Sequence, residues 1–177
     1  MWHRIRQVLH ALTARMTSQD YTFTAIYLNP KELQAFEAMD TNSQKHCILV
    51  AKTCLELLQD YPKGQIKVTT LVRAALLHDI GKVRGDLGTL DRVIVVMVDR
   101  LFPNVGAALS AESRHRNSTG LRHAFYIYHN HPSLGVETAI AIGVEREICQ
   151  LIADHHSSPY TGEPLELTIL RQADNLH

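Results

Sequence analysis

Cysteine is scarce in this 177-residue chain, which contains only Cys47, Cys54 and Cys149. Three scattered cysteines are too few for a disulfide framework and lack the paired spacing of a cysteine zinc site. An excess of one charge is also missing, because 18 Lys and Arg residues balance 18 Asp and Glu residues. Proteins neutralise a phosphate backbone with a basic excess, so we expect no dedicated nucleic-acid surface.

Long hydrophobic runs are lacking as well. The longest, residues 93–98, is far too short to cross a bilayer and is closed by Asp99 and Arg100. The first residues lack the apolar centre and small-residue cleavage site of a secretory signal. With 45% hydrophobic and 20% charged residues, the composition is that of a folded globular protein. We therefore expect a cytoplasmic protein with reduced cysteines.

The spacing of apolar residues predicts an amphipathic helix over residues 2–16, whose opposite face carries Arg4, Arg6, His10 and Arg15. A basic helix of this kind can contact an anionic membrane or a partner protein. The alternative is that its apolar face packs on the rest of the same domain.

Helical periodicity continues along the chain. Asn29, Pro30 and Glu32 have the types expected at a helix start, and residues 21–28 are read as helix rather than strand. Further helices are expected over residues 43–60, over 71–77 with Thr69 or Thr70 as the cap, and over 92–102, 133–142, 145–153 and 165–177. Pro132 is expected to open the helix over 133–142, and residues 110–120 to form a loop. The predicted fold class is all-α.

Histidine is the residue that the sequence has in excess, with 11 copies. Imidazole nitrogens and carboxylate oxygens are ligands for iron, manganese, cobalt or zinc. A carboxylate can also bridge two metals, and two adjacent metals can activate hydroxide and stabilise the leaving oxygen of a phosphoester. Any one of these histidines taken alone could be structural or solvated, so the prediction of a metal site depends on their arrangement along the chain.

That pattern resembles a known family. The segment AALLHDIGK at residues 74–82 resembles the central motif of the HD-domain metal-dependent phosphohydrolase superfamily, in its HDIG form. His46 upstream and Asp174 downstream complete the H…HD…D set. The segment HPSLG at 131–135 and the pair His155-His156 resemble dinuclear members. The resemblance implies an all-α HD-domain bundle over residues 40–177, with residues 1–39 as an N-terminal helical extension packed on it.

The resemblance also implies a dinuclear site. The first metal would be held by His46, His78, Asp79 and Asp174. Asp79 would bridge to a second metal, which His131 and either His155 or His156 would bind, while the remaining histidine completes the shell or touches substrate. The cofactors would be two divalent transition-metal ions, iron or manganese ahead of cobalt, nickel, zinc or magnesium.

The activity implied is hydrolysis of a phosphoester or phosphoanhydride bond in a small nucleotide-like substrate through a metal-bridging hydroxide. Asp79 and Lys82 are the expected catalytic residues, with Lys82 meeting a substrate phosphate. Arg114 and Arg116 are expected to bind phosphate, since guanidinium groups bind it bidentately, although an exposed basic loop is an equal alternative. The chain lacks a GYP motif after His156, which disfavours cyclic di-GMP.

Two alternatives share the same residues. Some HD proteins with di-iron sites are oxygenases, which would require O2 and iron. A non-catalytic metal-binding sensor or interaction domain is the other alternative, with the N-terminal helix as its docking element. Gly81, just after the HD pair, is expected to permit the backbone turn that leaves the helix.

Overall fold

The fold is all-α, as the sequence predicts. The computed structural model describes residues 15–62, 64–85 and 120–177, with isolated positions at 91, 94, 95, 97, 98 and 101. Within these residues the only β-type pairing is an isolated bridge between Met39 and Val83. The helices are α2 (Ser18–Tyr27), α3 (Pro30–Ala38), α4 (Thr41–Leu57), the short 3-10 helix η1 (Leu58–Asp60), α5 (Val68–Leu77), α8 (Leu121–Ile142), α9 (Arg146–Asp154) and α10 (Leu165–Leu176).

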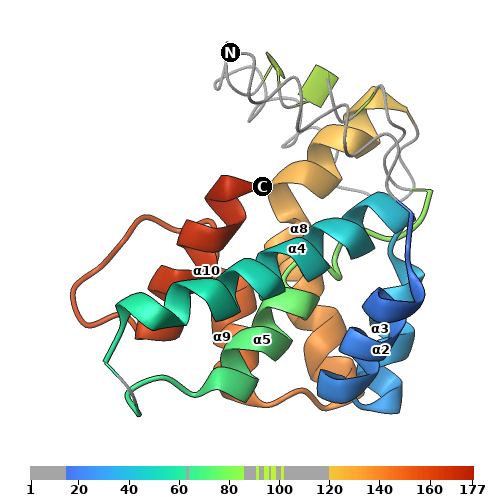
Figure 1. Cartoon of the computed structure of the whole chain (residues 1–177). Coiled ribbons are helices and arrows are strands. Elements are labelled where there is room, and N and C mark those ends of the chain that lie inside the picture. The colour runs from blue at the N-terminus through green and yellow to red at the C-terminus, as the bar shows by residue number, and fades with distance from the viewer. Residues whose placement is uncertain are drawn as a thin grey trace.

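The hydrophobic core lies between the long helix α4 and the helices packed against it. α4 contacts both α5 and α10, and α5 also contacts α9, which in turn packs on α8. In Figure 1, α4 crosses the molecule, with α2 and α3 near its first residues and α10 toward its other end. The α3 residue Phe36 and its neighbour Met39 are buried in the same core as these helices. The largest fully buried side chains include Phe36, Met39, Ile48, Leu71, Leu76, Leu77, Ile148, Leu151, Ile152 and Leu167.

The helix start predicted at Asn29 is confirmed. The Asn29 side chain accepts hydrogen bonds from the backbone nitrogens of Lys31 and Glu32, while the Glu32 side chain accepts the Asn29 N–H. Thr17 and Asp20 form the same reciprocal capping box at the start of α2. Residues 21–27 are therefore helical, because α2 begins with a complete cap and needs no strand partner.

The predicted cap of α5 is wrong. The helix begins at Val68, so Thr69 and Thr70 lie inside it, and Lys67 is the N-cap residue without a side-chain cap bond. The Lys67 N–H instead donates to Glu166 Oε1 of α10 at 2.7 Å. A carboxylate near a helix N-terminus interacts favourably with the helix dipole. Glu166, which lies 99 residues away in the sequence, therefore takes the capping role predicted for Thr69 or Thr70.

The predicted helix start at Pro132 is also wrong. α8 begins at Leu121 and continues to Ile142, with Pro132 in its interior. Proline in a helix interior removes one backbone hydrogen bond, yet α8 continues through Pro132 and packs against α9. His129 and His131 therefore lie on one continuous helix, where His129 is exposed and His131 is buried.

Three predictions fall outside the described residues. The basic amphipathic helix over 2–16 is described only at its last two residues, and the helix over 92–102 only at isolated positions. The loop over 110–120 is described only at Gly120.

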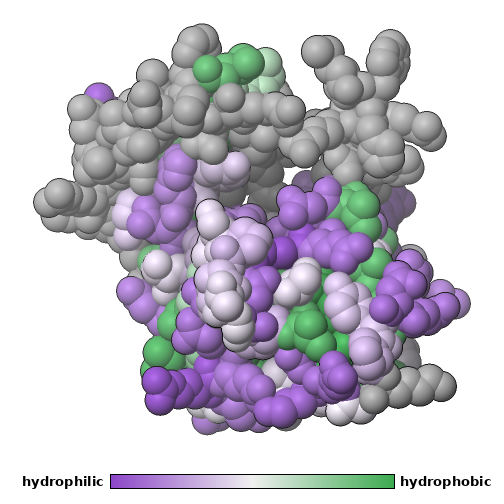
Figure 2. Space-filling view, turned by 90° about the vertical axis from the view of Figure 1, so that its left-hand side faces the viewer, coloured by the Kyte–Doolittle hydropathy of each residue, from purple (hydrophilic) through white to green (hydrophobic). Residues whose placement is uncertain are grey.

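One face of the described part of the molecule is largely hydrophilic. Figure 2 shows one face of the molecule, on which hydrophobic side chains form only small patches among polar ones. In the described part of the chain, none of the helices combines the length and the apolar character needed to cross a membrane.

Asp20 of α2 joins this helix to α4 through two ion pairs. Its buried carboxylate contacts the Lys45 and Lys52 ammonium groups of α4. Burial by itself raises the pKa of Asp20, but hydrogen bonds from Lys45, Thr17 and Lys52 outweigh it and hold the pKa well below its usual value. Asp20→Asn should lower the free energy of unfolding by about 2 kcal/mol at neutral pH. Equilibrium urea unfolding measures the loss.

The pH dependence of that loss has a defined sign. A depressed folded-state pKa contributes stability above the unfolded pKa, about 3.9 for aspartate, and the contribution is lost as the pH falls below it. The difference in the free energy of unfolding between native protein and Asp20→Asn should therefore have its full size at pH 7 and shrink below about pH 4. Asp60→Asn, at an exposed position, is the matched control. If this difference in unfolding free energy were the same at pH 3 as at pH 7, the ion pairs of Asp20 would contribute nothing to stability.

Candidate metal centre

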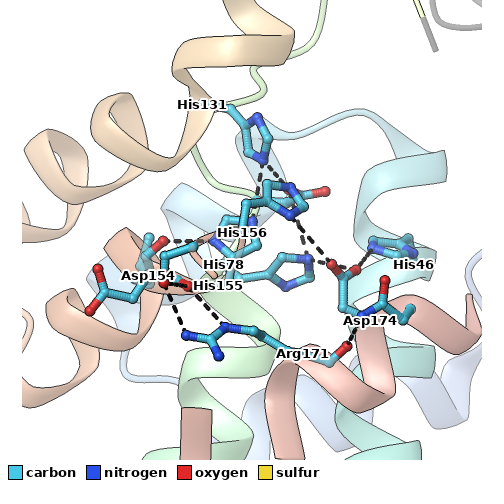
Figure 3. Close-up of polar contacts among 12 residues, drawn as sticks. His46, His78, His131, Asp154, His155, His156, Arg171 and Asp174 are labelled. Atoms are coloured by element: carbon cyan, nitrogen blue, oxygen red, sulfur yellow. Dashed lines mark hydrogen bonds and ion pairs between the residues drawn. The ribbon is translucent and has the colours of Figure 1, made fainter. Parts of the chain in front are cut away.

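The seven predicted ligands converge from five parts of the bundle. His46 comes from α4, and His131 from the middle of α8. His78 and Asp79 follow the last residue of α5, His155 and His156 follow that of α9, and Asp174 lies in α10. Figure 3 shows His131 reaching toward the His155-His156 pair while Asp174 points to His46. Each of the seven has a side-chain nitrogen or oxygen within 4.0 Å of another member.

One half of the centre is built around Asp174. Its Oδ1 atom lies 2.9 Å from His46 Nε2 and 3.6 Å from His78 Nε2. His78 Nε2 is in turn 3.8 Å from Asp79 Oδ1. Ligand atoms of His46, His78 and Asp79 all lie within 4.8 Å of one another, so this group could hold one metal ion.

The other half contains three histidines. Nε2 of His131 lies 3.3 Å from Nε2 of His155 and 3.4 Å from Asp79 Oδ1. The His156 ring contacts the His155 ring at a tilt of 42° with centroids 4.0 Å apart, and His156 Nδ1 lies 4.0 Å from Asp174 Oδ2. Ligand atoms of His131, His155 and His156 also lie within 4.8 Å of one another, so this group could hold a second ion. Asp79 lies between the two groups, as a bridging carboxylate must.

Three of the histidines have the same fixed tautomer. Nδ1 of His78, His131 and His155 lies 2.7–2.8 Å from the carbonyl oxygen three residues earlier in each case. A carbonyl oxygen only accepts hydrogen bonds, so each Nδ1 must carry the proton and donate it. In the neutral ring, Nε2 is then left with its lone pair facing the centre, as a metal ligand requires.

This arrangement fits a cation. The facing Nε2 atoms of His131 and His155 are both acceptors and cannot hydrogen-bond to each other. Protonation does not relieve the conflict, because burial lowers the pKa of His155 to about 3 and also lowers that of His131 well below its usual value. Asp79 Oδ1 is buried, and its closest contact within the described residues is the ion pair with Lys82 Nζ at 2.7 Å, without a hydrogen bond of good geometry. Two lone pairs and a carboxylate oxygen directed at one space are what a divalent transition metal binds.

Both carboxylates remain ionised despite their burial. Burial raises the pKa of Asp79, but Lys82, His78 and His131 outweigh it and hold the pKa well below its usual range. Burial likewise raises the pKa of Asp174, and the neighbouring His46 and His78 side chains outweigh it and hold the pKa well below its usual range. Lys82 Nζ lies 2.7 Å from Oδ1 and 2.9 Å from Oδ2 of Asp79. The sequence-predicted lysine therefore lies beside the two ligand groups and pairs with Asp79.

Gly81 is needed for close packing rather than for the predicted turn. Its φ is not positive, since the positive-φ glycines of the described chain are others. A Cβ atom at Gly81 would overlap the His131 carbonyl oxygen and lie 2.8 Å from the Gly135 nitrogen. The glycines of the HDIG and HPSLG segments therefore let α8 approach the HD pair closely enough to bring His131 to Asp79.

Arg171 is a supporting residue that sequence reasoning missed. This buried side chain of α10 donates to Asp154 O at 3.2 Å, to Ser157 Oγ at 2.9 Å and to Glu163 Oε2 at 2.8 Å. The first two acceptors flank His155 and His156, so Arg171 fixes the turn that carries both histidines (Figure 3). The local sequence held no signal for this, because the partners are 8 to 17 residues away, between the end of α9 and residue 163.

Arg114 and Arg116, the predicted phosphate-binding arginines, lie outside the described residues. A pocket of about 360 Å³ opens beside the centre. It is lined by His155, His156, Ser157, Pro159, Glu163, Thr168, Arg171, Asp174 and Asn175.

Comparison with known proteins identifies the family. The family model named HD domain matches residues 44–177, which contain all seven converging residues. Neither the curated proteins nor the solved structures gave a match to the chain. Because the matched region covers most of the sequence and includes the whole centre, the chain belongs to the HD domain family, whose members are typically metal-dependent phosphohydrolases.

Proposed function

We propose that the protein is a metal-dependent phosphohydrolase that cleaves a phosphoester or phosphoanhydride bond of a small nucleotide-like substrate. The observation that carries the proposal is the pair of ligand groups that share Asp79 at their junction. The donor set of imidazole and carboxylate suits two divalent transition metals, iron or manganese first. Bound there, such metals would activate water and stabilise the charge that develops on the phosphoryl oxygens.

The chain's own residues would divide the remaining tasks. Asp79 holds the two groups together through one carboxylate, while the carbonyl-bonded histidines keep their Nε2 atoms directed inward. Lys82 supplies a cation beside the centre, which suits contact with a substrate phosphate. The pocket next to His156 has the volume of a small-molecule site at the lower end of the usual range. Its lining residues, most of them polar or charged, suit the non-reacting part of such a substrate, with Arg114 and Arg116 as further candidate phosphate ligands.

The test begins with elemental analysis of protein purified without added metal or chelator. We expect close to two equivalents of transition metal per chain, followed by phosphate release from a panel of nucleotides and phosphoesters. O2 consumption with an iron-only requirement and no phosphate release would assign the di-iron oxygenase instead. Failure to take up metal on reconstitution would exclude both enzymes and leave the interaction domain.

Lys82 separates substrate binding from metal binding. Lys82→Met should leave the metal content unchanged, because lysine supplies no metal ligand here, and should lower kcat/KM for phosphate release about tenfold to a hundredfold. Lys67→Met is the matched control, since Lys67 is an exposed lysine paired with Glu147. Loss of metal from Lys82→Met would show that the lysine supports the centre rather than the substrate.

A further inference from the structure

The carbonyl partners of His78 and His155 come from helix ends. Each of these residues directly follows the last residue of a helix, α5 for His78 and α9 for His155. Their acceptors, Ala75 O and Ile152 O, belong to the final turns of those helices. The last four carbonyls of a helix have no intrahelical N–H partner, so the helix end makes an acceptor available to each ring.

His131 has no helix end beside it. It lies inside α8, which continues to Ile142, yet its Nδ1 makes the same bond, to Tyr128 O at 2.7 Å. In a continuous helix, the carbonyl of residue 128 receives the N–H of residue 132. Residue 132 is proline, which has no N–H. The proline removes the backbone donor to the carbonyl that His131 uses.

We propose that Pro132 is a positioning residue of the metal centre. By withholding a backbone N–H from the Tyr128 carbonyl, it leaves this oxygen to the Nδ1–H of His131 and keeps the His131 Nε2 lone pair directed at the metal. The inference rests on the metal centre of the proposed function, but not on the reaction performed there.

The position of the proline agrees with this role. Proline is the least favourable residue in a helix interior, and α8 continues past it rather than ending or starting there. His131 is buried, with only 1% of its surface exposed. Water is therefore excluded as a substitute partner for Nδ1, and the ring depends on the carbonyl.

The first experiment separates helix stability from metal affinity. Co²⁺ is titrated by calorimetry into metal-free native protein and into metal-free Pro132→Ala. Loss of an outer partner of a histidine ligand typically weakens metal binding 10- to 100-fold, so one of the two binding events should weaken by about this factor. The melting temperature of the metal-free variant should rise, because alanine restores the helix hydrogen bond. A fall in both quantities would assign Pro132 a packing role and overturn the proposal.

A matched variant isolates the N–H group. Replacing Pro132 with lactic acid, by nonsense suppression with the α-hydroxy acid, gives the alanine side chain without a backbone N–H. This variant should keep the native Co²⁺ affinity within about threefold, while Pro132→Ala does not. Equal weakening in both variants would show that the proline ring, and not the missing donor, matters.

The tautomer itself can be measured in the absence of metal. In ¹⁵N-histidine-labelled, metal-free protein, His131 should be protonated at Nδ1, and Pro132→Ala should shift it toward the Nε2-protonated form. The spectra of His78 and His155 serve as internal references, because their carbonyl partners are untouched. An unchanged His131 tautomer would overturn the proposal. This readout is independent of phosphate release, so failure of the proposed function would leave the result interpretable.

Discussion

In the Asp79→Ala protein, elemental analysis should find close to no bound metal, and phosphoester hydrolysis should fall at least about a thousandfold. The reason is the position of this carboxylate between the two ligand groups, 3.8 Å from His78 Nε2 and 3.4 Å from His131 Nε2. A ligand shared by two ions is lost from both when it is removed. Inductively coupled plasma mass spectrometry of the purified protein, with phosphate release on the same sample, measures both effects.

Two other aspartates provide the controls. Asp174 contacts His46 and His78 most closely, so Asp174→Ala should lose the first metal and keep the second. Asp154 precedes His155 but bonds to Gln150 and Tyr160 at the surface, so Asp154→Ala should keep both metals. Asp79→Asn, which conserves the shape of the side chain, guards against misfolding of the alanine variant. Retention of both metals in Asp79→Ala and Asp79→Asn would refute the bridging role.

The group of candidate metal ligands could be anticipated from the sequence because metal coordination demands particular residue types. Metal ligands are limited to few side chains, and the HD pair with its outlying histidines and aspartate provides a distinctive order along the chain. The structure brings all of them together. The order of these residues along the chain does not specify their geometry, such as the placement of Asp79 between the two ligand groups.

Some helix boundaries are set by neighbouring residues in the sequence, and others by contacts between distant elements. Asn29 and Glu32 are three residues apart, so their capping box is legible in the sequence and is present. The acceptor for Lys67, by contrast, comes from Glu166 in another helix. The preference of proline for first turns predicts a helix start at Pro132, but α8 runs through it from Leu121 to Ile142. Contacts between distant elements override local preference, and the sequence of one segment does not specify them.

The sequence predicts that Gly81 matters for a backbone turn, whereas the structure shows that it matters for close packing against α8. Positive φ is a property of the local backbone, whereas close approach depends on where α8 lies. A backbone carbonyl and a backbone nitrogen line the space at Gly81, and neither can rotate away as a side chain could. The motif glycine therefore acts on the site through packing.

Gly81→Ala should consequently be among the most destabilising single substitutions in the chain. We expect the free energy of unfolding to fall by about 3 kcal/mol or more, because overpacking against backbone forces α8 to move. For a domain of this size the melting temperature should fall by roughly 10 °C. Displacement of α8 would also carry His131 away from Asp79, so any folded fraction should lose the second metal first. Thermal unfolding and metal analysis of the same preparation measure the two effects.

Other glycines of the same region distinguish crowding from backbone strain. Gly143 has φ +84° and nothing within 4 Å of an added Cβ, so Gly143→Ala should cost only about 1 kcal/mol and leave the metals bound. At Gly135 the nearest atom is the Ile152 Cγ2 methyl at 3.2 Å, which can shift by a few tenths of an ångström. Gly135→Ala should therefore lie between the other two. If Gly81→Ala were no more destabilising than Gly143→Ala, contact with α8 could not be what Gly81 provides, and the His131–Asp79 distance would have to be set elsewhere in the bundle.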